Sequence, residues 1–402
     1  MTDPGVSELI TVPEATRIVD AAAVVRRSVT IPLSQSNGLY LSADLKNDRD
    51  APPFDKSLMD GYAVRSADLA NIPRELTVVD RIAAGGVAIR AIQPGEATAI
   101  MTGAALPTGA DAVVPVEFTE MAAGQNRVRI NQSVPARKFI AVRGSDAPAG
   151  AVVLKSGTRL GPAQAAVAAG IGIVDLPVFS APSVAVLGTG DELVGPEQTP
   201  VGNQIRSCNN AMLMMLLQRY PCRAIDLGLV PDDPAIIEHQ IQTGLNHDVL
   251  LITGGMSMGE RDFVPGILRK LGAEFKITKL RIKPGKPFIF AKMPGEKFVF
   301  GLPGNPVSAF VCTVCFVSRL LKRIAGGTPG SINRAAPLAG ALEPNGNRAF
   351  YQPAIFDGQV LVPLQWKGSA DIYTLGQANA LLIRPENQPA QAAGTLVEFI
   401  EI

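Results

Sequence analysis

The sequence predicts a protein of several domains, one with alternating strands and helices and the others rich in β structure. Between Ser183 and Ile324, short apolar runs alternate with helical patterns, which is typical of a parallel α/β sheet. From Leu76 to about Pro182, and again after Gly326, short β-branched runs are separated by Gly and Pro. A length of 402 residues favours two to four domains.

The N-terminal half begins with a helix and continues as β structure. Thr11-Val12-Pro13-Glu14 is a capping box that predicts a helix through about Arg27. A second helix is expected at Ala163–Ala169. The runs between them predict an antiparallel sheet. They are Thr77–Ile82, Ala97–Met101, Ala112–Val116 and Val128–Ile130.

The second half predicts an α/β domain with right-handed crossovers, followed by a small β-barrel or sandwich that extends to Ile402. The α/β elements follow one another in regular order. Strands are expected at Val184–Leu187, Ala224–Val230 and Val249–Thr253, and helices at Asn210–Gln218, Pro234–Leu245, Phe263–Leu271 and Asn305–Ile324.

Composition excludes several classes of function. The formal net charge is +1, so no overall field would attract nucleic acid or an anionic membrane. The longest apolar run, Ala309–Val317, is too short to span a bilayer. Four cysteines are too few for a disulfide framework in a chain of this length. Met1–Ile10 lacks the features of a signal peptide, so we expect a cytoplasmic protein.

Carboxylates and glycines follow the α/β strands, where open parallel sheets bind ligands. Asp191 and Glu192 follow the first strand, and Asp232 and Asp233 follow the second. With Asp262, these carboxylates could supply the oxygen ligands that Mg²⁺ prefers. Glu192 is the first choice, because it lies just past a strand end beside a glycine. Asp232 or Asp233 before Pro234 is a natural helix cap instead.

Gly254–Gly259 follows the third strand and contains a hydroxyl at Ser257. Its backbone N–H groups could hold a phosphate, with help from the start of the next helix. The same spacing also suits an ordinary strand-to-helix turn, and the pattern alone leaves both interpretations open. It is not a Walker loop, because no Gly-Lys-Ser/Thr follows.

The stretch Lys283–Pro306 holds two loops rich in Gly and Pro, separated by the expected strands Phe288–Ala291 and Phe298–Phe300. Lys283 and Lys286 lie on a loop that proline makes rigid, and Lys279 is close in sequence. Lysines placed in this way suit a phosphate or another oxyanion, although Lys279 is equally compatible with a solvated strand edge. Asn305-Pro306 predicts a helix cap with proline at the first helical position.

Other polar groups give weaker signals. Cys312 and Cys315 lie inside an apolar helix, which favours buried structural thiols over a zinc or redox site. The two histidines lack the spacing of a metal site. The loop Phe54–Ala63, which includes Asp60, suits either a structured turn or a functional loop.

Taken together, these motifs resemble the molybdopterin molybdenumtransferase family, known as MoeA in bacteria and as the gephyrin E domain in eukaryotes. The matches run in family order over nearly the whole chain, and six in order are highly specific. They are Pro53–Arg65, Met101–Ala104, Thr189–Leu193, Gly254–Gly259, Lys283–Pro287 and Gly301–Ala309, with weaker matches at Arg143–Asp146 and Gly368-Ser369.

The resemblance implies a four-part homodimer. Residues 1–46 and 149–177 would form a hinge domain, 47–148 an inserted β domain, 178–328 a molybdopterin-binding-type parallel α/β domain, and 329–402 a C-terminal β-barrel. In the family the cleft lies between the α/β part of one subunit and the inserted part of the other. That arrangement would give the Asp60 loop a role.

The resemblance also implies the reaction: Mg²⁺-dependent insertion of molybdate into adenylated molybdopterin, with release of AMP. Expected partners are the molybdopterin adenylyltransferase and acceptor molybdoenzymes. Residues matching catalytic positions are Asp60, Glu192, Asp232, Lys279 and Lys283, with Glu192, Asp232 and Asp262 as metal ligands. Residues matching substrate-binding positions are Thr102, Gly254, Gly255, Ser257, Asp262, Lys286, Pro287, Pro303, Gly304, Asn305, Pro306, Ser308, Arg348 and Ser369. Of these, Lys286, Ser308, Arg348 and Ser369 match the molybdate pocket.

Departures from the family pattern bear on rate and substrate preference. Ser145 stands where the family usually has Glu, and Ser207 where an acidic residue is usual.

Two other functions compete with this interpretation. One is a nicotinamide mononucleotide deamidase of the competence-protein type, which would leave the Asp60 loop and the C-terminal region unexplained. Another is a divergent scaffold protein, which loss of Glu192, Lys283 or Lys286 would favour, yet all three are present. Tungstate is nearly the same size and charge as molybdate, so either oxyanion fits.

Overall fold

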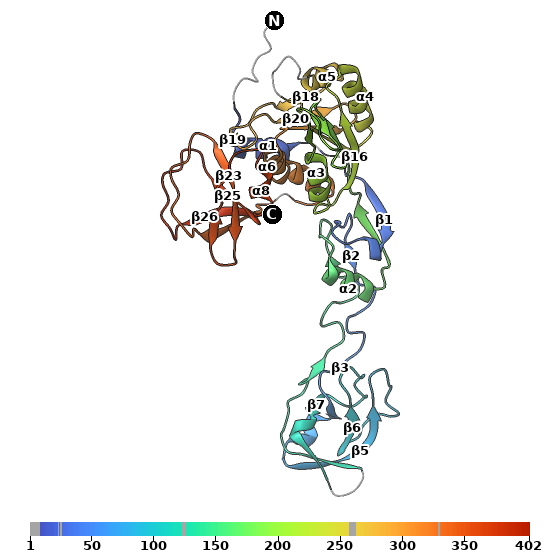
Figure 1. Ribbon diagram of the computed structural model, residues 1–402. Coiled ribbons are helices and arrows are strands. Elements are labelled where there is room, and N and C mark those ends of the chain that lie inside the picture. Colours follow the sequence, from blue (N-terminus) through green and yellow to red (C-terminus); the bar gives the residue numbers. More distant parts are fainter. Residues whose placement is uncertain (1–8, 23, 25, 123–125, 257–262, 329) are drawn as a thin grey trace. The chain divides into compact units, whose positions relative to one another are not determined.

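The computed structural model describes the 402-residue chain except for residues 1–8, 23, 25, 123–125, 257–262 and 329. The chain divides into two compact units (Figure 1). The larger unit holds Met1–Ser42, Gly157–Gly161 and Leu176–Ile402, and the smaller unit holds Ala43–Ser156 and Pro162–Asp175. In the part of the chain that is described, no helix has the length and apolarity needed to cross a membrane.

The smaller unit is built on a six-stranded sheet in the order β7-β4-β6-β5-β9-β8. Its pairs are antiparallel except β5 with β6, which run parallel, so the expectation of a purely antiparallel sheet is wrong. Residues 83–95 join these two strands and are long enough for a crossover. The strands are β4 (Gly61–Val64), β5 (Arg74–Ile82), β6 (Glu96–Ile100), β7 (Ala112–Pro115), β8 (Thr119–Met121) and β9 (Arg127–Ile130).

Short elements complete this unit. Helix α2 (Pro162–Gly170) confirms the helix expected at Ala163–Ala169. Tyr62, Leu76, Val114 and Val128 are buried in the core on one face of the six-stranded sheet. The remaining elements are the pairs β2 (Leu45–Lys46) with β11 (Val152–Leu154) and β3 (Lys56–Ser57) with β10 (Ile140–Ala141), and the 3₁₀ turns Ser66–Leu69 and Val116–Phe118.

The larger unit contains the predicted α/β sheet, in the order β16-β13-β17-β21-β20-β18. The first four strands are parallel to one another, whereas β20 and β18 are antiparallel additions at one edge. The hairpin β20–β21 contains the two strands expected within the lysine-rich stretch. The strands are β13 (Ser183–Thr189), β16 (Arg223–Val230), β17 (Val249–Thr253), β18 (Glu274–Ile277), β20 (Ile289–Met293) and β21 (Lys297–Leu302).

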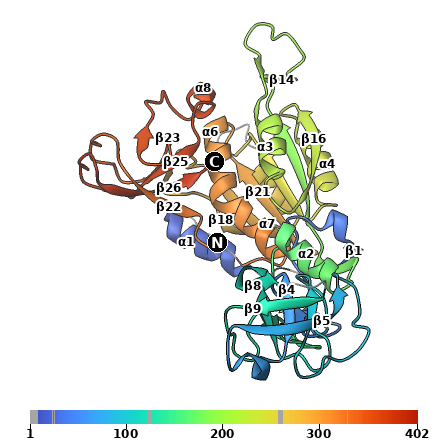
Figure 2. The ribbon, with the colours of Figure 1, turned by 90° about the horizontal axis from the view of Figure 1, so that it is seen from below.

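Both faces of this sheet are buried at its central strands, which is why β13, β17 and β21 are almost continuously apolar. Along β13, Val184 and Val186 pack into one core and Ala185 and Leu187 into the other. Helices α6 and α7 lie between this sheet and the C-terminal sheet (Figure 2). The helices are α3 (Asn209–Leu217), α4 (Pro234–Gly244), α5 (Val264–Lys270), α6 (Pro306–Cys312) and α7 (Ser318–Ile324).

The helix expected over Asn305–Ile324 is interrupted by one π-helical turn, Thr313–Val317. Two hydroxyls bond back to the preceding turn: Thr313 Oγ1 donates to the Ala309 carbonyl and Ser318 Oγ to the Val314 carbonyl. Such bonds compete with regular helix geometry. Cys312 and Cys315 are buried here, as expected of structural thiols, and burial raises the pKa of the Cys312 thiol.

The C-terminal β region forms a second six-stranded sheet in the larger unit, β19-β23-β25-β26-β22, with β24 paired to β23. Strand β19 (Ile282–Lys283) runs parallel to the start of β23, so the lysine loop is attached to this sheet. The other elements are β22 (Asn333–Pro337), β23 (Ala349–Phe356), β24 (Leu361–Pro363), β25 (Ala380–Arg384), β26 (Leu396–Glu401) and the short helix α8 (Ile372–Leu375).

Helix α1 (Val12–Ala21) starts where the capping box predicts, with the Thr11 side chain accepting from the Glu14 N–H. Its expected extension to Arg27 is wrong. The Arg323 guanidinium donates to the carbonyls of Val19 and Ala22, which stabilises the helix end at that point. Strand β1 (Ser28–Pro32) follows and pairs with β12 (Asp175–Phe179).

Asp233 is the cap of α4, because its carboxylate accepts from the N–H groups of Ala235 and Ile236. Replacing Asp233 with alanine is expected to destabilise the first turn of α4 by about 1 kcal/mol. Hydrogen exchange of the α4 amides should accelerate by about fivefold. Asp233→Ser keeps an oxygen acceptor and should exchange almost as slowly as the wild type; equal acceleration in both variants would contradict the capping role.

Candidate functional site

The carboxyl ends of β13 and β16 are held together by the turns that follow them. The Asp232 N–H donates to Asp191 Oδ1 at 3.0 Å. Gly190 has φ +153°, and a Cβ there would lie 2.7 Å from Glu192 Oε2, so the Glu192 carboxylate is folded against the Gly190 backbone. The turns that carry the predicted ligands Glu192 and Asp232 are therefore neighbours.

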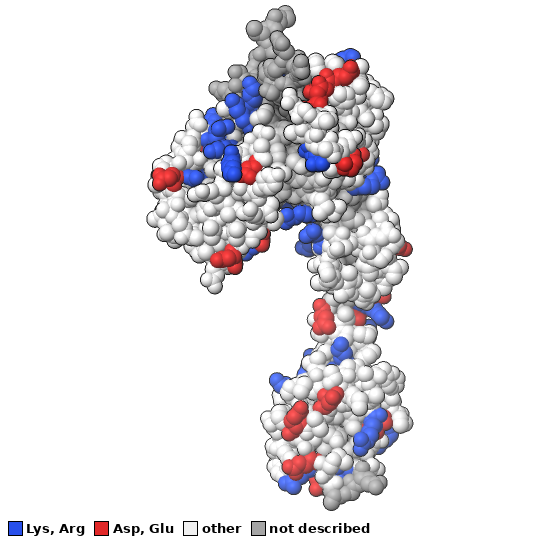
Figure 3. Space-filling view, viewed as in Figure 1, with Lys and Arg blue, Asp and Glu red and all other residues white. Residues whose placement is uncertain are grey.

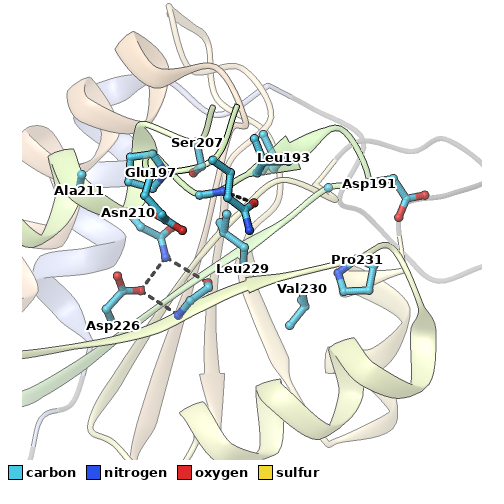
Figure 4. Close-up of a pocket in the computed structure, with 16 residues that line it drawn as sticks. Asp191, Leu193, Glu197, Ser207, Asn210, Ala211, Asp226, Leu229, Val230 and Pro231 are labelled. Atoms are coloured by element: carbon cyan, nitrogen blue, oxygen red, sulfur yellow. Dashed lines mark hydrogen bonds between the residues drawn. The ribbon is translucent and has the colours of Figure 1, made fainter. Parts of the chain in front are cut away.

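A cavity of about 620 Å³ opens beside these turns (Figure 4). The Asn210 amide donates to Asp226 Oδ1 at 2.7 Å and to the Gly228 carbonyl at 3.1 Å. The Gly228 N–H also donates to Asp226 Oδ1, at 2.8 Å. Gly228 has φ +79° where the β13–β16 register shifts, so this network holds a β-bulge. The lining includes Gly190, Asp191, Leu193, Glu197, Ser207, Asn210, Asp226, Leu229 and Pro231.

Asn210 and Asp226 were not among the predicted site residues. The sequence feature that could have indicated this network is the isolated Gly228, because a glycine inside a strand pattern suggests a β-bulge. Ser207, which departs from the family pattern, is buried in the wall of this cavity.

The glycines after β17 are required by close backbone approach. Gly254 has φ +91°, and a Cβ there would lie 2.2 Å from the Thr189 carbonyl oxygen. A Cβ on Gly304 would lie 3.8 Å from the Gly254 Cα, so the two predicted glycine loops meet. Thr189 Oγ1 is buried and has no hydrogen-bond partner among the described residues. The missing side chains of these glycines therefore let three backbone segments approach one another closely.

The loop Pro303–Pro306 is tied to two other segments. The Asn209 amide donates to the Gly304 carbonyl at 2.7 Å, and the Val307 N–H donates to the Ser369 carbonyl at 3.1 Å. Asn305 occupies the cap position of α6, but its side chain does not cap the helix. The expected cap position of Asn305 and the proline at the start of α6 are thus confirmed, but the side-chain capping bond does not form. The Asn305 amide donates to Ser369 Oγ at 2.7 Å and links α6 to the C-terminal segment.

The lysine loop lies beside α6. A Cβ on Gly285 would lie 2.7 Å from Cys312 Sγ and 4.0 Å from the Ser308 carbonyl oxygen. Lys and Arg side chains gather near the β19 edge of the C-terminal sheet (Figure 3). Within the described part of the chain, none of the predicted cations forms an ion pair with a carboxylate. These cations are Lys279, Lys283, Lys286 and Arg348.

The smaller unit carries Asp60 and Thr102 as a hydrogen-bonded pair. Both the Thr102 N–H and its hydroxyl donate to Asp60 Oδ1, at 2.7 and 2.8 Å. The N–H bond, followed by the hydroxyl bond, holds the pKa of the exposed Asp60 carboxyl below its ordinary value. A cavity of about 310 Å³ adjoins Asp60 and is lined also by Arg81, Met101 and Val116.

Replacing Thr102 with valine is expected to raise the Asp60 pKa toward its ordinary value, because the hydroxyl donor is lost while the N–H remains. A depressed folded-state pKa contributes stability above the unfolded pKa, and that contribution disappears as pH falls through the folded value. The variant should therefore lose this contribution at a higher pH than the wild type. A carbon NMR titration of the Asp60 carboxyl measures the shift; an unchanged midpoint would contradict the assigned cause.

The structure brings several of the predicted site residues together, and others lie outside the described part of the chain. Glu192 and Asp232 lie on joined turns, and Gly254 meets Gly304. Ser257 and Asp262 lie outside the described residues. Because Asp262 is outside this range, Glu192 and Asp232 are the described members of the predicted metal set. Among the described residues, no group of three or more His, Cys, Asp or Glu side chains could hold a metal ion. Pro287 is the last residue of the lysine loop, and Pro306 is the first residue of α6.

Comparison with known proteins gives consistent matches along the chain. Residues 10–172 match the MoeA N-terminal region (domain I and II), residues 185–323 a probable molybdopterin binding domain, and residues 335–402 the MoeA C-terminal region (domain IV).

Relatives match over most of their length. A molybdopterin molybdenumtransferase from Synechococcus elongatus is 36% identical, with 92% of this chain and 93% of that protein covered. One from Bacillus subtilis is 31% identical, with 98% and 94% covered. The crystal structure of a molybdopterin biosynthesis MoeA protein from Pyrococcus horikoshii OT3 is similar, with a TM-score of 0.86, 28% identity, and 98% of this chain and 100% of that chain covered.

Proposed function

Because the chain belongs to the MoeA family of molybdopterin molybdenumtransferases, which act in molybdenum cofactor biosynthesis, we propose that it inserts molybdate into adenylated molybdopterin and releases AMP in a Mg²⁺-dependent reaction. The observation that carries this proposal is the group of cations on and around the lysine loop that have no carboxylate partner in the described chain, on a loop whose Gly285 approaches α6 at Ser308 and Cys312. An oxyanion is the ligand that such a group suits.

Molybdate would bind to Lys286, Arg348, Ser308 and Ser369. Gly285, beside Lys286, lies close to the Ser308 backbone, and Ser369 is bonded to Asn305 at the start of α6. Lysine supplies a compact charge and arginine a planar fork, while hydroxyls complete the hydrogen bonds to a tetrahedral dianion. Lys279 and Lys283 would offset negative charge on the pyrophosphate of the adenylated substrate.

Glu192 and Asp232, together with Asp262, would hold Mg²⁺. Their carboxylate oxygens are the ligand type that Mg²⁺ prefers, and the hydrogen bond between the two turns keeps the first two residues near each other. When bound, Mg²⁺ supplies positive charge to phosphate oxygens. Asp60, whose carboxylate accepts two hydrogen bonds from Thr102, would be the catalytic carboxylate contributed by the smaller unit. The glycine loop Gly254-Gly255 and Thr102 would contact the substrate.

The proposal includes the four-part domain organisation, a homodimer and a cytoplasmic location. It also includes supply of the substrate by a molybdopterin adenylyltransferase and delivery of the product to molybdoenzymes. The cations that would bind molybdate would bind tungstate equally well, since the two oxyanions have the same charge.

The test is to mix the purified protein with adenylated molybdopterin, Mg²⁺ and molybdate, and to follow AMP release and cofactor formation. We expect AMP release that requires molybdate or tungstate and that stops when Mg²⁺ is chelated. Tight binding of the adenylated substrate without turnover would identify a carrier or scaffold. AMP release that is the same without an oxyanion would refute the transferase assignment.

A further inference from the structure

The Lys283 side chain lies against two aromatic rings of the C-terminal sheet. Its Nζ is 4.5 Å from the centroid of the Phe350 ring and 5.9 Å from that of Trp366. The two rings are themselves in contact, with centroids 5.3 Å apart at 34°. Lys283 pairs with Phe350 across β19 and β23, so the strand register places the ammonium on the ring.

Both rings are held in place by their surroundings. Phe350 is 5% exposed, and the Arg384 guanidinium lies 5.7 Å from its centroid. Trp366 begins a segment fixed by three bonds: the Lys367 N–H to Asp371 Oδ2, the Asn305 amide to Ser369 Oγ, and the Val307 N–H to the Ser369 carbonyl. The segment is thereby attached to the start of α6, next to Ser308, one of the residues proposed to bind the oxyanion.

A ring face differs from a carboxylate as a partner for lysine. It attracts the ammonium through its quadrupole, but it neutralises no charge and leaves the N–H bonds free for an anion. The lysine stem is long and flexible, and fixing it costs conformational entropy before any ligand arrives. Aromatic contacts would remove part of that cost in advance while the charge stays available.

We propose that Phe350 and Trp366 are positioning residues that hold the Lys283 ammonium, charged and oriented, for the anionic substrate. This inference rests on the proposed function, in which Lys283 contacts the pyrophosphate. The rings act through Lys283 and not on the substrate directly.

Trp366 is the sole tryptophan, which makes a selective test possible. Protein labelled with 5-fluorotryptophan gives one fluorine resonance, and no assignment is needed. We expect that resonance to move in Lys283→Met, to stay near its wild-type position in Lys283→Arg, which keeps a cation, and to stay unchanged in the matched control Lys286→Met. An unchanged fluorine chemical shift in Lys283→Met would overturn the inference.

Kinetic measurements then distinguish a positioning role of Trp366 from a purely structural role in packing. Trp366→Leu is expected to lower kcat by about two- to fivefold, the size of one such contact, with little change in KM for molybdate. Trp366→Phe keeps a ring face and should restore most of the rate. In the Lys283→Met background, Trp366→Leu should have no further effect. Independent, multiplicative losses would show that Trp366 does not act through Lys283.

The two readouts also separate this inference from the proposed function. The fluorine measurement requires no turnover. If AMP release is absent while the resonance responds to Lys283→Met, the aromatic contact stands and the transferase assignment fails. If turnover is present and depends on Lys283 while the resonance does not move, the positioning role fails.

Discussion

Gly254→Ala is expected to abolish cofactor formation and to lower the stability of the larger unit. The φ of +91° at Gly254 is unfavourable for alanine. The added Cβ would lie 2.2 Å from the carbonyl oxygen of Thr189, a backbone atom that no side-chain rotation can move. The ends of β13 and β17 would therefore have to separate, at the position where Gly254 also meets Gly304.

The expected size of this effect is a decrease in unfolding free energy of about 2–4 kcal/mol, from backbone strain and overpacking together. Activity should fall more than stability explains, because Gly254 lies in the proposed phosphate loop. Binding of adenylated molybdopterin, measured by calorimetry well below the unfolding temperature, should be lost.

Gly266→Ala is the matched control for this substitution. Gly266 lies in α5, and a Cβ there would have no atom within 4 Å. Alanine is the better helix former, so this variant should be more stable by about 0.5–1 kcal/mol and fully active. If Gly254→Ala retains substrate binding, or if both variants lose it equally, the role given to Gly254 is wrong.

Regular elements with strong local signals could be predicted from the sequence. The apolar strands of the α/β sheet and the capping box at Thr11 were confirmed close to their expected positions. Features that depend on distant partners could not be predicted. The end of α1 is stabilised by Arg323, a residue about 300 positions away, and the parallel pairing of β5 with β6 is set by how residues 83–95 cross over.

The candidate site shows the same division. Motifs within one segment, such as Gly254-Gly255 and Lys283–Pro287, indicated backbone approach and cation placement. The Asn210–Asp226 network joins α3 to a bulge in β16, so neither residue forms a local motif. Asn305 occupies the cap position that its residue type predicts, but the bond from its amide to Ser369, 64 positions along the chain, could not be predicted.

Glu192→Gln is expected to reduce molybdate-dependent AMP release by about 10²- to 10³-fold, the range for loss of one electrostatic stabiliser in a transition state. Glutamine keeps the shape of the side chain, so its fit against Gly190 should survive. The charge that would hold Mg²⁺ is lost, and the concentration of Mg²⁺ needed for half-maximal rate should therefore rise.

Glu197→Gln provides the control for this change, because Glu197 is another exposed carboxylate, on the wall of the neighbouring cavity. It removes the same charge from the same region without changing any predicted metal ligand.

If both variants lose activity to the same degree, the loss comes from the change in overall electrostatic field and not from the loss of a metal ligand. If Glu192→Gln keeps the wild-type rate and Mg²⁺ requirement, Mg²⁺ is held elsewhere or Asp232 and Asp262 suffice. A loss confined to Glu192→Gln, with thermal unfolding unchanged, would place the metal at the joined turns of β13 and β16.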